Sequence, residues 1–301
     1  MRKFFLSFAI AMLAATSSAD AATSGIVHTA DVDLATESLG RPGRTMPLIA
    51  VNGGPGLSHA YMVQNDVWNT IAARGRQVVF YDQRGTGKST RVRTGAPQTM
   101  KAQVADLEAV RAKFGFAQFD LVGDSYGGFL GMAYALKYPA RVHKLVLSDS
   151  PAAAIKDIVH LLPQVYPDIE AQAAATQKRL GTSPAAAQAS LRDHFRMIFY
   201  SEAKRDTYLA QAQDLGYNPQ VGEAVSTAAS KLDMTSKLSG FTFPTLVITG
   251  RFDMNVAPLT AWKLAKAIRG SKLVIFERSG HLPSYEEPEK YVAVLEQFLG
   301  P

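Results

Sequence analysis

Cysteine is absent from the 301-residue sequence. The chain therefore has no disulfide bond, no thiol nucleophile, no cysteine-ligated metal and no lipid-modified N-terminal cysteine. Its stability must come from a hydrophobic core. A composition of 47% hydrophobic and 19% charged residues provides enough apolar material for one large α/β domain.

Blocks of like charge and long apolar runs are also missing. Lysine and arginine nowhere form a block of five or more, so the formal net charge of +6 indicates a solvated surface and not a nucleic-acid site. The N-terminal apolar run, residues 4–15, has 12 residues, whereas a helix needs about 20 to span a bilayer. We therefore expect no nucleic-acid partner and no stable membrane insertion of the mature protein.

The N-terminus has the pattern of a secretory signal. Arg2 and Lys3 precede the apolar run, and small residues follow it up to the Ala-x-Ala pattern of residues 19–21. A basic start, a short apolar stretch and such a site are typical of a cleavable signal peptide. We expect cleavage after Ala21 and a periplasmic or secreted protein, and the sequence leaves open which of the two.

Short apolar segments alternate with segments of helical pattern along the mature chain. Their continuous hydrophobicity favours strands buried on both faces, and the alternation favours a mostly parallel, doubly wound α/β sheet. The expected strands are 47–51, 77–81, 119–122, 142–147, 245–249 and 272–276. The expected helices are 100–113, 129–137, 259–267 and 288–298. In such a sheet, ligands bind beyond the carboxyl ends of the strands.

Residues 151–239 interrupt this alternation. The segment is rich in alanine, glutamine, leucine and charged residues and has no convincing strand pattern. We expect a helical lid over the strand ends, and a helical hairpin packed elsewhere is the alternative. The predicted organisation is a signal peptide (1–21), an α/β core (22–150 and 240–301) and the lid (151–239), with core and lid folding as one unit.

A G-x-S-x-G pentapeptide, residues 123–127, directly follows the expected strand 119–122 and precedes an expected helix. A serine on a tight strand-to-helix turn is lifted clear of the sheet, and a Cβ two residues to either side would clash as the chain reverses. The motif alone is weak evidence, but its place between strand and helix predicts that Ser125 is a nucleophile.

A serine hydroxyl needs a base to remove its proton and a carboxylate to orient that base. Asp253 and His281 each follow a late expected strand, and the order Ser125, Asp253, His281 is that of the α/β-hydrolase triad. Asp149 also follows a strand and is the rival for the carboxylate. Asp124 is expected to point away from His281 as a local hydrogen-bonding residue. The other histidines are His28, His59, His143, His160 and His194.

The glycine-rich segment 52–56 follows the expected strand 47–51 and is a candidate oxyanion loop. Backbone N–H groups in such a loop stabilise the charge that develops on the substrate oxygen. We assign the two N–H donors to Gly54 and Tyr126. An ordinary Pro-Gly turn is the alternative interpretation.

Together these motifs resemble those of proline iminopeptidases and their relatives. The matching segments are N-G-G-P-G (52–56), D-Q-R-G-T-G-K-S (82–89), G-D-S-Y-G-G (123–128), G-R-F-D (250–253) and G-H (280–281). The resemblance implies the α/β-hydrolase fold, with a mostly parallel, doubly wound sheet and a helical lid inserted after the sixth strand. It also implies that Asp82 and Arg84 organise the loop beneath the active site, where a buried pair of this kind would brace the turn.

The same resemblance implies hydrolysis of an N-terminal residue, usually proline, with lid carboxylates holding the substrate amine. The lid departs from the family pattern, because it lacks the usual tryptophan-rich stretch and offers only Glu202, after Phe199-Tyr200-Ser201. The family's usual tryptophan after the nucleophile is replaced by Tyr126. Glu202 is thus the candidate for amine binding, with a solvated lid carboxylate as the alternative.

We therefore expect an exported serine hydrolase that needs no cofactor or metal and cleaves a small-molecule or short-peptide amide, as an aminopeptidase or amino-acid amidase. An esterase or lactonase using the same triad is the alternative, because lid composition sets the substrate in this fold. A receptor that keeps the triad without turnover is a third reading. The substrate, its ester or amide nature and the oligomeric state stay open.

Overall fold

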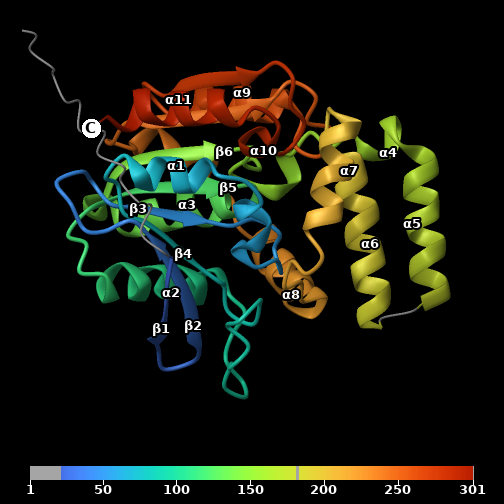
Figure 1. Cartoon of the computed structure of the whole chain (residues 1–301), viewed down its shortest axis with the longest axis horizontal. Helices are drawn as coiled ribbons and strands as arrows, with labels where there is room; N and C mark the ends of the chain where they lie inside the picture. The colour runs from blue at the N-terminus through green and yellow to red at the C-terminus, as the bar shows by residue number, and fades with distance from the viewer. Residues whose placement is uncertain (1–21, 181–182, 301) are drawn as a thin grey trace, which may run out of the picture.

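An eight-stranded sheet crosses the centre of the molecule, and helices cover both of its faces (Figure 1). This computed structural model describes residues 22–180 and 183–300, so the expected signal peptide lies outside the described residues. The strands are β1 Thr23–His28, β2 Asp33–Leu39, β3 Leu48–Val51, β4 Val78–Tyr81, β5 Phe119–Asp124, β6 Val142–Ser148, β7 Thr245–Gly250 and β8 Lys272–Phe276.

The sheet is mostly parallel. Its strands lie in the order β1-β2-β4-β3-β5-β6-β7-β8, and only the pairs β1–β2 and β2–β4 are antiparallel. Every residue of β3, β4, β5 and β7 is buried, as expected for strands covered on both faces. The predicted doubly wound α/β fold is confirmed.

Helices from distant parts of the chain form the two outer layers. Residues of α1 and α11 belong to the apolar cluster on one face of the sheet, and residues of α2, α3 and α9 belong to the cluster on the other. These helices and the short α10 span α1 Val67–Ala73, α2 Met100–Lys113, α3 Tyr126–Lys137, α9 Pro258–Ala267, α10 Pro283–Glu286 and α11 Pro288–Leu299. The 3₁₀ helices are η1 His59–Val63, η2 Pro139–Arg141, η3 Ile155–Asp157 and η4 Thr235–Gly240.

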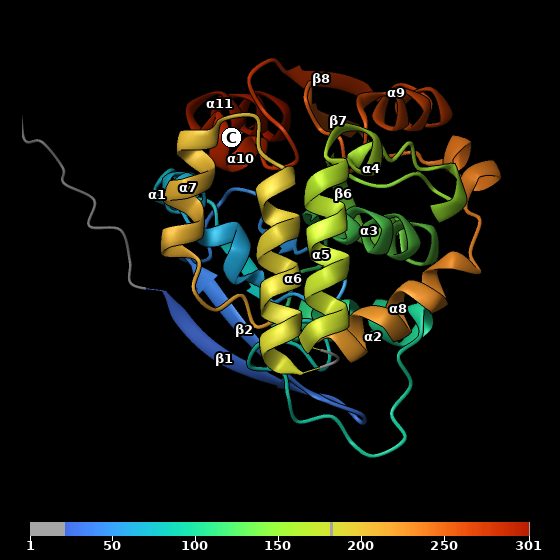
Figure 2. The same cartoon turned by 90° about the vertical axis from the view of Figure 1, so that its right-hand side faces the viewer.

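The helices of the segment between β6 and β7 stand mostly at one end of the sheet. Figure 2 shows α5, α6 and α7 in front of the strands. The helices of this segment are α4 Leu162–Val165, α5 Pro167–Leu180, α6 Pro184–Met197, α7 Glu202–Gln211 and α8 Pro219–Ser230. Backbone hydrogen bonds from Ser58 to Leu215 and from Asn218 to Gly56 join the segment to the loop after β3. Because that loop leaves the carboxyl end of β3, these helices cover the end where ligands bind.

The strands β1 and β2 and the helices α1 and α10 are absent from the sequence-based prediction. β1 lies at the edge of the sheet and only Val27 among its residues is buried, so it lacks a hydrophobic run. β2 alternates between half-buried and buried positions, a pattern that its threonine, serine and glutamate residues conceal.

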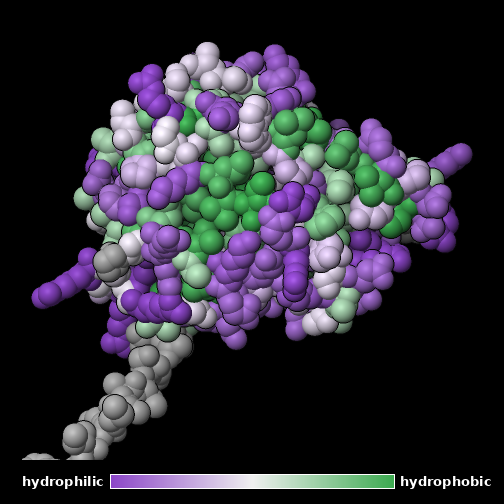
Figure 3. All heavy atoms as spheres, turned by 90° about the horizontal axis from the view of Figure 1, so that it is seen from above, coloured by the Kyte–Doolittle hydropathy of each residue, from purple (hydrophilic) through white to green (hydrophobic). Residues whose placement is uncertain are grey.

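The opposite edge of the sheet, β8, is more apolar. Leu273, Val274 and Ile275 are half-buried there, and Leu259 and Trp262 of the neighbouring α9 are about half exposed. Figure 3 views the molecule from this side and shows hydrophobic side chains gathered in the middle of the face. Within residues 22–180 and 183–300, no helix is both long and apolar enough to cross a bilayer.

The loop after β4 is braced by two separate ion pairs, because Asp82 and Arg84 do not pair with each other. Asp82 accepts hydrogen bonds from Nδ1 of His59, at 2.7 Å, and from the N–H of Lys88. The Arg84 guanidinium contacts both carboxylate oxygens of Asp106, at 2.6 and 2.7 Å, and both side chains are buried. Burial raises the pKa of Asp106, and the Arg84 charge opposes that shift.

Removal of the Arg84 charge should destabilise the fold. In Arg84→Leu, Asp106 would be a buried carboxylate without a cation, and we expect the free energy of unfolding in urea to fall by about 3–5 kcal/mol. Arg91→Leu is the matched control, because the Arg91 side chain is 88% exposed and its pairing with Asp33 contributes under about 1 kcal/mol. Equal losses in the two variants would contradict this account.

Candidate active site

Ser125 stands on a strained turn between β5 and α3. Its φ of +49° lies in the left-handed region, which a non-glycine residue rarely adopts outside functional sites. A Cβ built on Gly127 would lie 2.1 Å from the carbonyl oxygen of Val51, and one on Gly123 would lie 2.5 Å from that of Gly127. The two glycines are therefore required for the turn, as the G-x-S-x-G pattern predicts.

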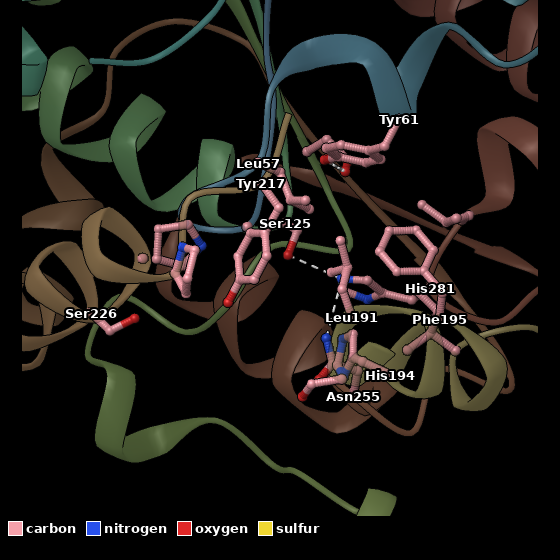
Figure 4. Close-up of a pocket in the computed structure, with 18 of the residues that line it drawn as sticks. Leu57, Tyr61, Ser125, Leu191, His194, Phe195, Tyr217, Ser226, Asn255 and His281 are labelled. Carbon is pink, nitrogen blue, oxygen red and sulfur yellow. Dashed lines mark hydrogen bonds between the residues drawn. The ribbon is translucent and has the colours of Figure 1, made fainter. Parts of the chain in front are cut away.

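His281 and Asp253 face this serine from the ends of the neighbouring strands. Asp253 follows β7 and His281 follows β8, and both side chains are buried. The Ser125 hydroxyl lies 3.0 Å from Nε2 of His281 (Figure 4). Nδ1 of His281 lies 2.6 Å from Oδ2 of Asp253. The structure thus brings the three residues together in the hydrogen-bonded chain that nucleophilic catalysis by serine requires.

Asp253 is fixed by the backbone as well. Its Oδ1 accepts hydrogen bonds from the N–H groups of Asn255, at 2.9 Å, and Val256, at 2.8 Å. Burial lowers the pKa of His281, but the carboxylates of Asp253, Asp149 and Asp124 outweigh this effect and raise it to about 9. The site therefore stabilises the imidazolium form of His281.

Asp149, the rival carboxylate, lies beside this pair. It directly follows β6 with a φ of +47°, and its oxygens accept hydrogen bonds from the hydroxyl of Ser148 and the N–H of Gly250. Burial and the charge of Asp253 hold its pKa well above the usual range. Donor atoms of Asp149, Asp253 and His281 lie within 4.8 Å of one another, a spacing suited to a cation, but these atoms already hydrogen-bond to protein groups.

The candidate oxyanion donors lie beside Ser125. Gly54 and Tyr126 line a cavity that also contains Ser125, and Tyr126 is the first residue of α3, where N–H groups point outward. Neither N–H donates a hydrogen bond to any residue of the part that the structure describes. A Cβ on Gly53 would lie 2.7 Å from Cβ of Ser125, so the loop packs directly against the serine.

Two cavities meet at the serine. The first has a volume of about 460 Å³, within the range of small-molecule sites, and its described lining contains Asp124 and Glu223 but no lysine or arginine. Its apolar wall consists of Leu57, Leu191, Phe195, Ile198 and Leu282. Figure 4 shows Tyr217 and Ser226 on one side of Ser125 and Phe195 and His194 on the other. The second cavity, of about 340 Å³, has an apolar wall of Pro151, Ile155, Ile158 and Val256.

Glu202 lies apart from both cavities. Its side chain is 85% exposed on α7, its carboxylate is 3.7 Å from the Arg205 guanidinium, and it is not among the described lining residues. The lid carboxylate in the first cavity is instead Glu223 on α8. The sequence distinguishes Glu223 from the other lid carboxylates only by its place next to Gly222, so the signal is weak. Because Gly222 has no side chain, α8 can approach the carbonyl of Pro55.

The lid contacts the histidine loop directly, a feature absent from the sequence-based analysis. The buried carboxylate of Glu286 accepts hydrogen bonds from the N–H groups of Tyr200, Ser201 and Gly280. The N–H of His281 also donates to the carbonyl of Ile198, at 2.7 Å. The position of His281 therefore depends on residues 198–201 of the lid.

The parallel sheet, the serine turn and the facing histidine together define the class of the α/β hydrolases. A family model described as the alpha/beta hydrolase fold matches residues 46–288. The proline iminopeptidase of Saccharolobus solfataricus is 30% identical, over 85% of this chain and 86% of its own. That of Lactobacillus helveticus is also 30% identical, over 84% of this chain and 89% of its own.

Solved structures agree on the fold. The proline iminopeptidase of Mycobacterium smegmatis superposes with a TM-score of 0.67 at 25% identity, covering 92% of this chain and 97% of that one. An esterase from Exiguobacterium antarcticum superposes with a TM-score of 0.71 over 91% of this chain and 98% of that one, but at 21% identity it shows the fold alone. The chain belongs to the α/β-hydrolase fold family and is a serine hydrolase similar to proline iminopeptidases.

The geometry predicts which carboxylate orients the base. Asp253→Asn should lower kcat by about 10⁴-fold, because the amide would hold His281 in the wrong tautomer. Asp149→Asn should cause a much smaller loss, because Asp149 makes no hydrogen bond to His281 among the described residues. Steady-state kinetics of the two variants measure both losses in kcat. A larger loss in Asp149→Asn would show that Asp149, and not Asp253, orients His281.

The pH profile tests the same pair. His281 must be neutral to accept a proton, so kcat/KM should rise with pH, reach half of its maximum near the His281 pKa of about 9 and level off only at higher pH. Asp253→Asn removes the main group that raises this pKa, so the midpoint should move to lower pH. An unchanged midpoint would show that the Asp253 charge does not control the base.

Proposed function

We propose that this protein is an exported aminopeptidase or amino-acid amidase that releases an N-terminal residue, proline or a small residue, from short peptides or amides. The observation that carries the proposal is the charge of the first cavity. Its described lining holds two carboxylates, Asp124 and Glu223, and no lysine or arginine, so the lining has a net negative charge when His281 is in the neutral form that catalysis needs. Such a cavity favours a substrate with a free ammonium group. The curated relatives named proline iminopeptidase agree with this substrate class.

In the proposed reaction, the Ser125 oxygen attacks the carbonyl carbon while His281 takes the hydroxyl proton. The N–H groups of Gly54 and Tyr126 stabilise the oxyanion, and Asp253 stabilises the imidazolium. The tetrahedral intermediate then breaks its C–N bond, and His281 gives its proton to the leaving amine. A water molecule, deprotonated by His281, hydrolyses the acyl-enzyme and releases the amino acid.

An esterase or lactonase acting through the same three residues is the second candidate. The apolar wall of the first cavity favours it, because Leu57, Phe195 and Leu282 would suit an acyl chain that carries no charge. An amine-dependent enzyme and an esterase therefore differ in their need for the substrate amine, not in their chemistry at Ser125.

Export forms part of the proposal and is supported by the basic, apolar and Ala-x-Ala pattern of residues 2–21. N-terminal sequencing of protein recovered from a secreting bacterial host should begin at Ala22. Protein that retains Met1 in the cytoplasm would contradict export and leave the activity proposal intact.

The activity is tested by hydrolysis of prolyl and alanyl p-nitroanilides against p-nitrophenyl butyrate. We expect anilide cleavage that disappears when the substrate amine is acetylated. Ser125→Ala should lose at least about 10³-fold in kcat, because no acyl-enzyme can form. Ester cleavage without anilide cleavage would favour the esterase. Tight binding without turnover of either substrate would leave only a receptor, and unchanged turnover in Ser125→Ala would refute the mechanism.

A further inference from the structure

Asp124 occupies the position directly before Ser125, at the end of β5. Its side chain is only 3% exposed, yet it lines the same cavity as Ser125 and His281. The proposed reaction uses Ser125, His281, Asp253 and two backbone N–H groups, and it gives Asp124 no step. A buried carboxylate at the wall of a reaction cavity therefore has no role in the chemistry described above.

The hydrogen bonding of this carboxylate is incomplete. Within the described residues, only the hydroxyl of Tyr61 donates to it, through Oδ2. Tyr61 in turn accepts a hydrogen bond from the N–H of Gly53, at 2.6 Å, in the loop that packs on Ser125. A carboxylate has about four acceptor positions, and buried ones are normally filled. The group is thus held rigidly by one donor and keeps capacity for another on the cavity side.

Asp124 is also within reach of the substrate group in question. The α-amine of a substrate is bonded to the carbon next to the carbonyl that Ser125 attacks, so its anchor must lie close to the serine. A Cβ built on Gly53 would lie 2.7 Å from Cβ of Ser125 and 2.8 Å from the hydroxyl oxygen of Tyr61, which donates to the Asp124 carboxylate, so this carboxylate lies close to the serine. Glu223, the other carboxylate of the lining, lies on α8 in the lid and is exposed to solvent, where its charge is screened.

We infer that Asp124, held in place by Tyr61, binds the ammonium group of the substrate and so restricts the enzyme to acyl groups with a free amine. This inference rests on the proposed function. It assigns recognition of the amine to a residue of the core and not to a lid carboxylate. An ammonium at Asp124 would complete the hydrogen bonding of the carboxylate and neutralise its buried charge.

The acid–base state of Asp124 agrees with this role. Burial and, to a smaller extent, the nearby charge of Asp253 raise the pKa of Asp124 to about 6, although the His281 charge and the Tyr61 hydroxyl oppose this shift. The carboxyl group is therefore mostly ionised at neutral pH but poorly stabilised without a partner. A cationic ligand supplies the missing stabilisation.

The test compares two substrates that differ only at the amine. Proline benzyl ester carries a ring NH₂⁺ where cyclopentanecarboxylic acid benzyl ester carries CH₂, and both are cleaved through the same Ser125 and His281. The readout is the ratio of their kcat/KM values. In Asp124→Asn, which keeps an oxygen for Tyr61, we expect this ratio to fall about 100-fold, because a truncated buried charge pair loses a large part of its binding.

The ratio of the two kcat/KM values separates a loss of amine recognition from a general loss of activity. Asp124 also raises the pKa of His281, but any change in the base affects both esters and cancels. Asp206→Asn is the matched control, because it makes the same chemical change on an exposed lid carboxylate and should leave the ratio unchanged. A proportional loss on both esters in Asp124→Asn would assign Asp124 a structural role only and overturn the inference.

Two further variants locate the amine. If Glu223→Gln lowers the ratio and Asp124→Asn does not, the amine is bound by the lid and the inference is wrong, whereas the proposed aminopeptidase stands. If the wild type prefers the cyclopentane ester and cleaves no anilide, the proposed function itself fails. If Asp124→Asn does not fold, Asp124→Ala is assayed in its place, with and without added formate. Recovery of the ratio by formate supports the inference, and no recovery in a folded Asp124→Ala contradicts it.

Discussion

The hydrogen bond between His281 and Asp253 is the interaction on which the rest of the site depends. It joins the ends of β7 and β8 at 2.6 Å, and it holds the imidazole so that Nε2 faces Ser125. Two loops from neighbouring parallel strands can meet in this way only because their carboxyl ends lie at the same edge. The covered, parallel sheet is therefore the condition for the chemistry.

A concentration of buried acid accompanies this bond. Asp124 is the last residue of β5, Asp149 and Asp253 follow β6 and β7, and all three influence His281. The three carboxylates have different hydrogen-bond partners. Asp124 accepts from one phenol, and Asp149 accepts from a hydroxyl and a backbone N–H. Asp253 contacts the imidazole and accepts from two backbone N–H groups. We propose that this difference in partners gives similar residues different roles, with Asp124 as amine anchor, Asp149 as supporting group and Asp253 as orienting acid.

Local patterns in the sequence predict much of this arrangement. The six apolar segments are all strands in the structure. The geometry brings Ser125, Asp253 and His281 together, because each lies in the turn or loop that follows a parallel strand. Contacts between distant segments were harder to predict. The partner of Arg84 is Asp106 on α2, and Glu202 points to solvent while Glu223 lines the cavity. Side-chain direction on an amphipathic lid helix depends on packing that the sequence does not display.

Glu286 ties residues 200 and 201 to Gly280, and Ile198 accepts the N–H of His281. This connection bears on how new specificities arise in the family. The lid is inserted at a single point between β6 and β7, so an exchange of the whole segment by recombination looks simple. A chimera would nevertheless receive, with its new lid, the backbone that positions His281. Lids are therefore expected to be inherited together with the histidine loop, as one evolving unit.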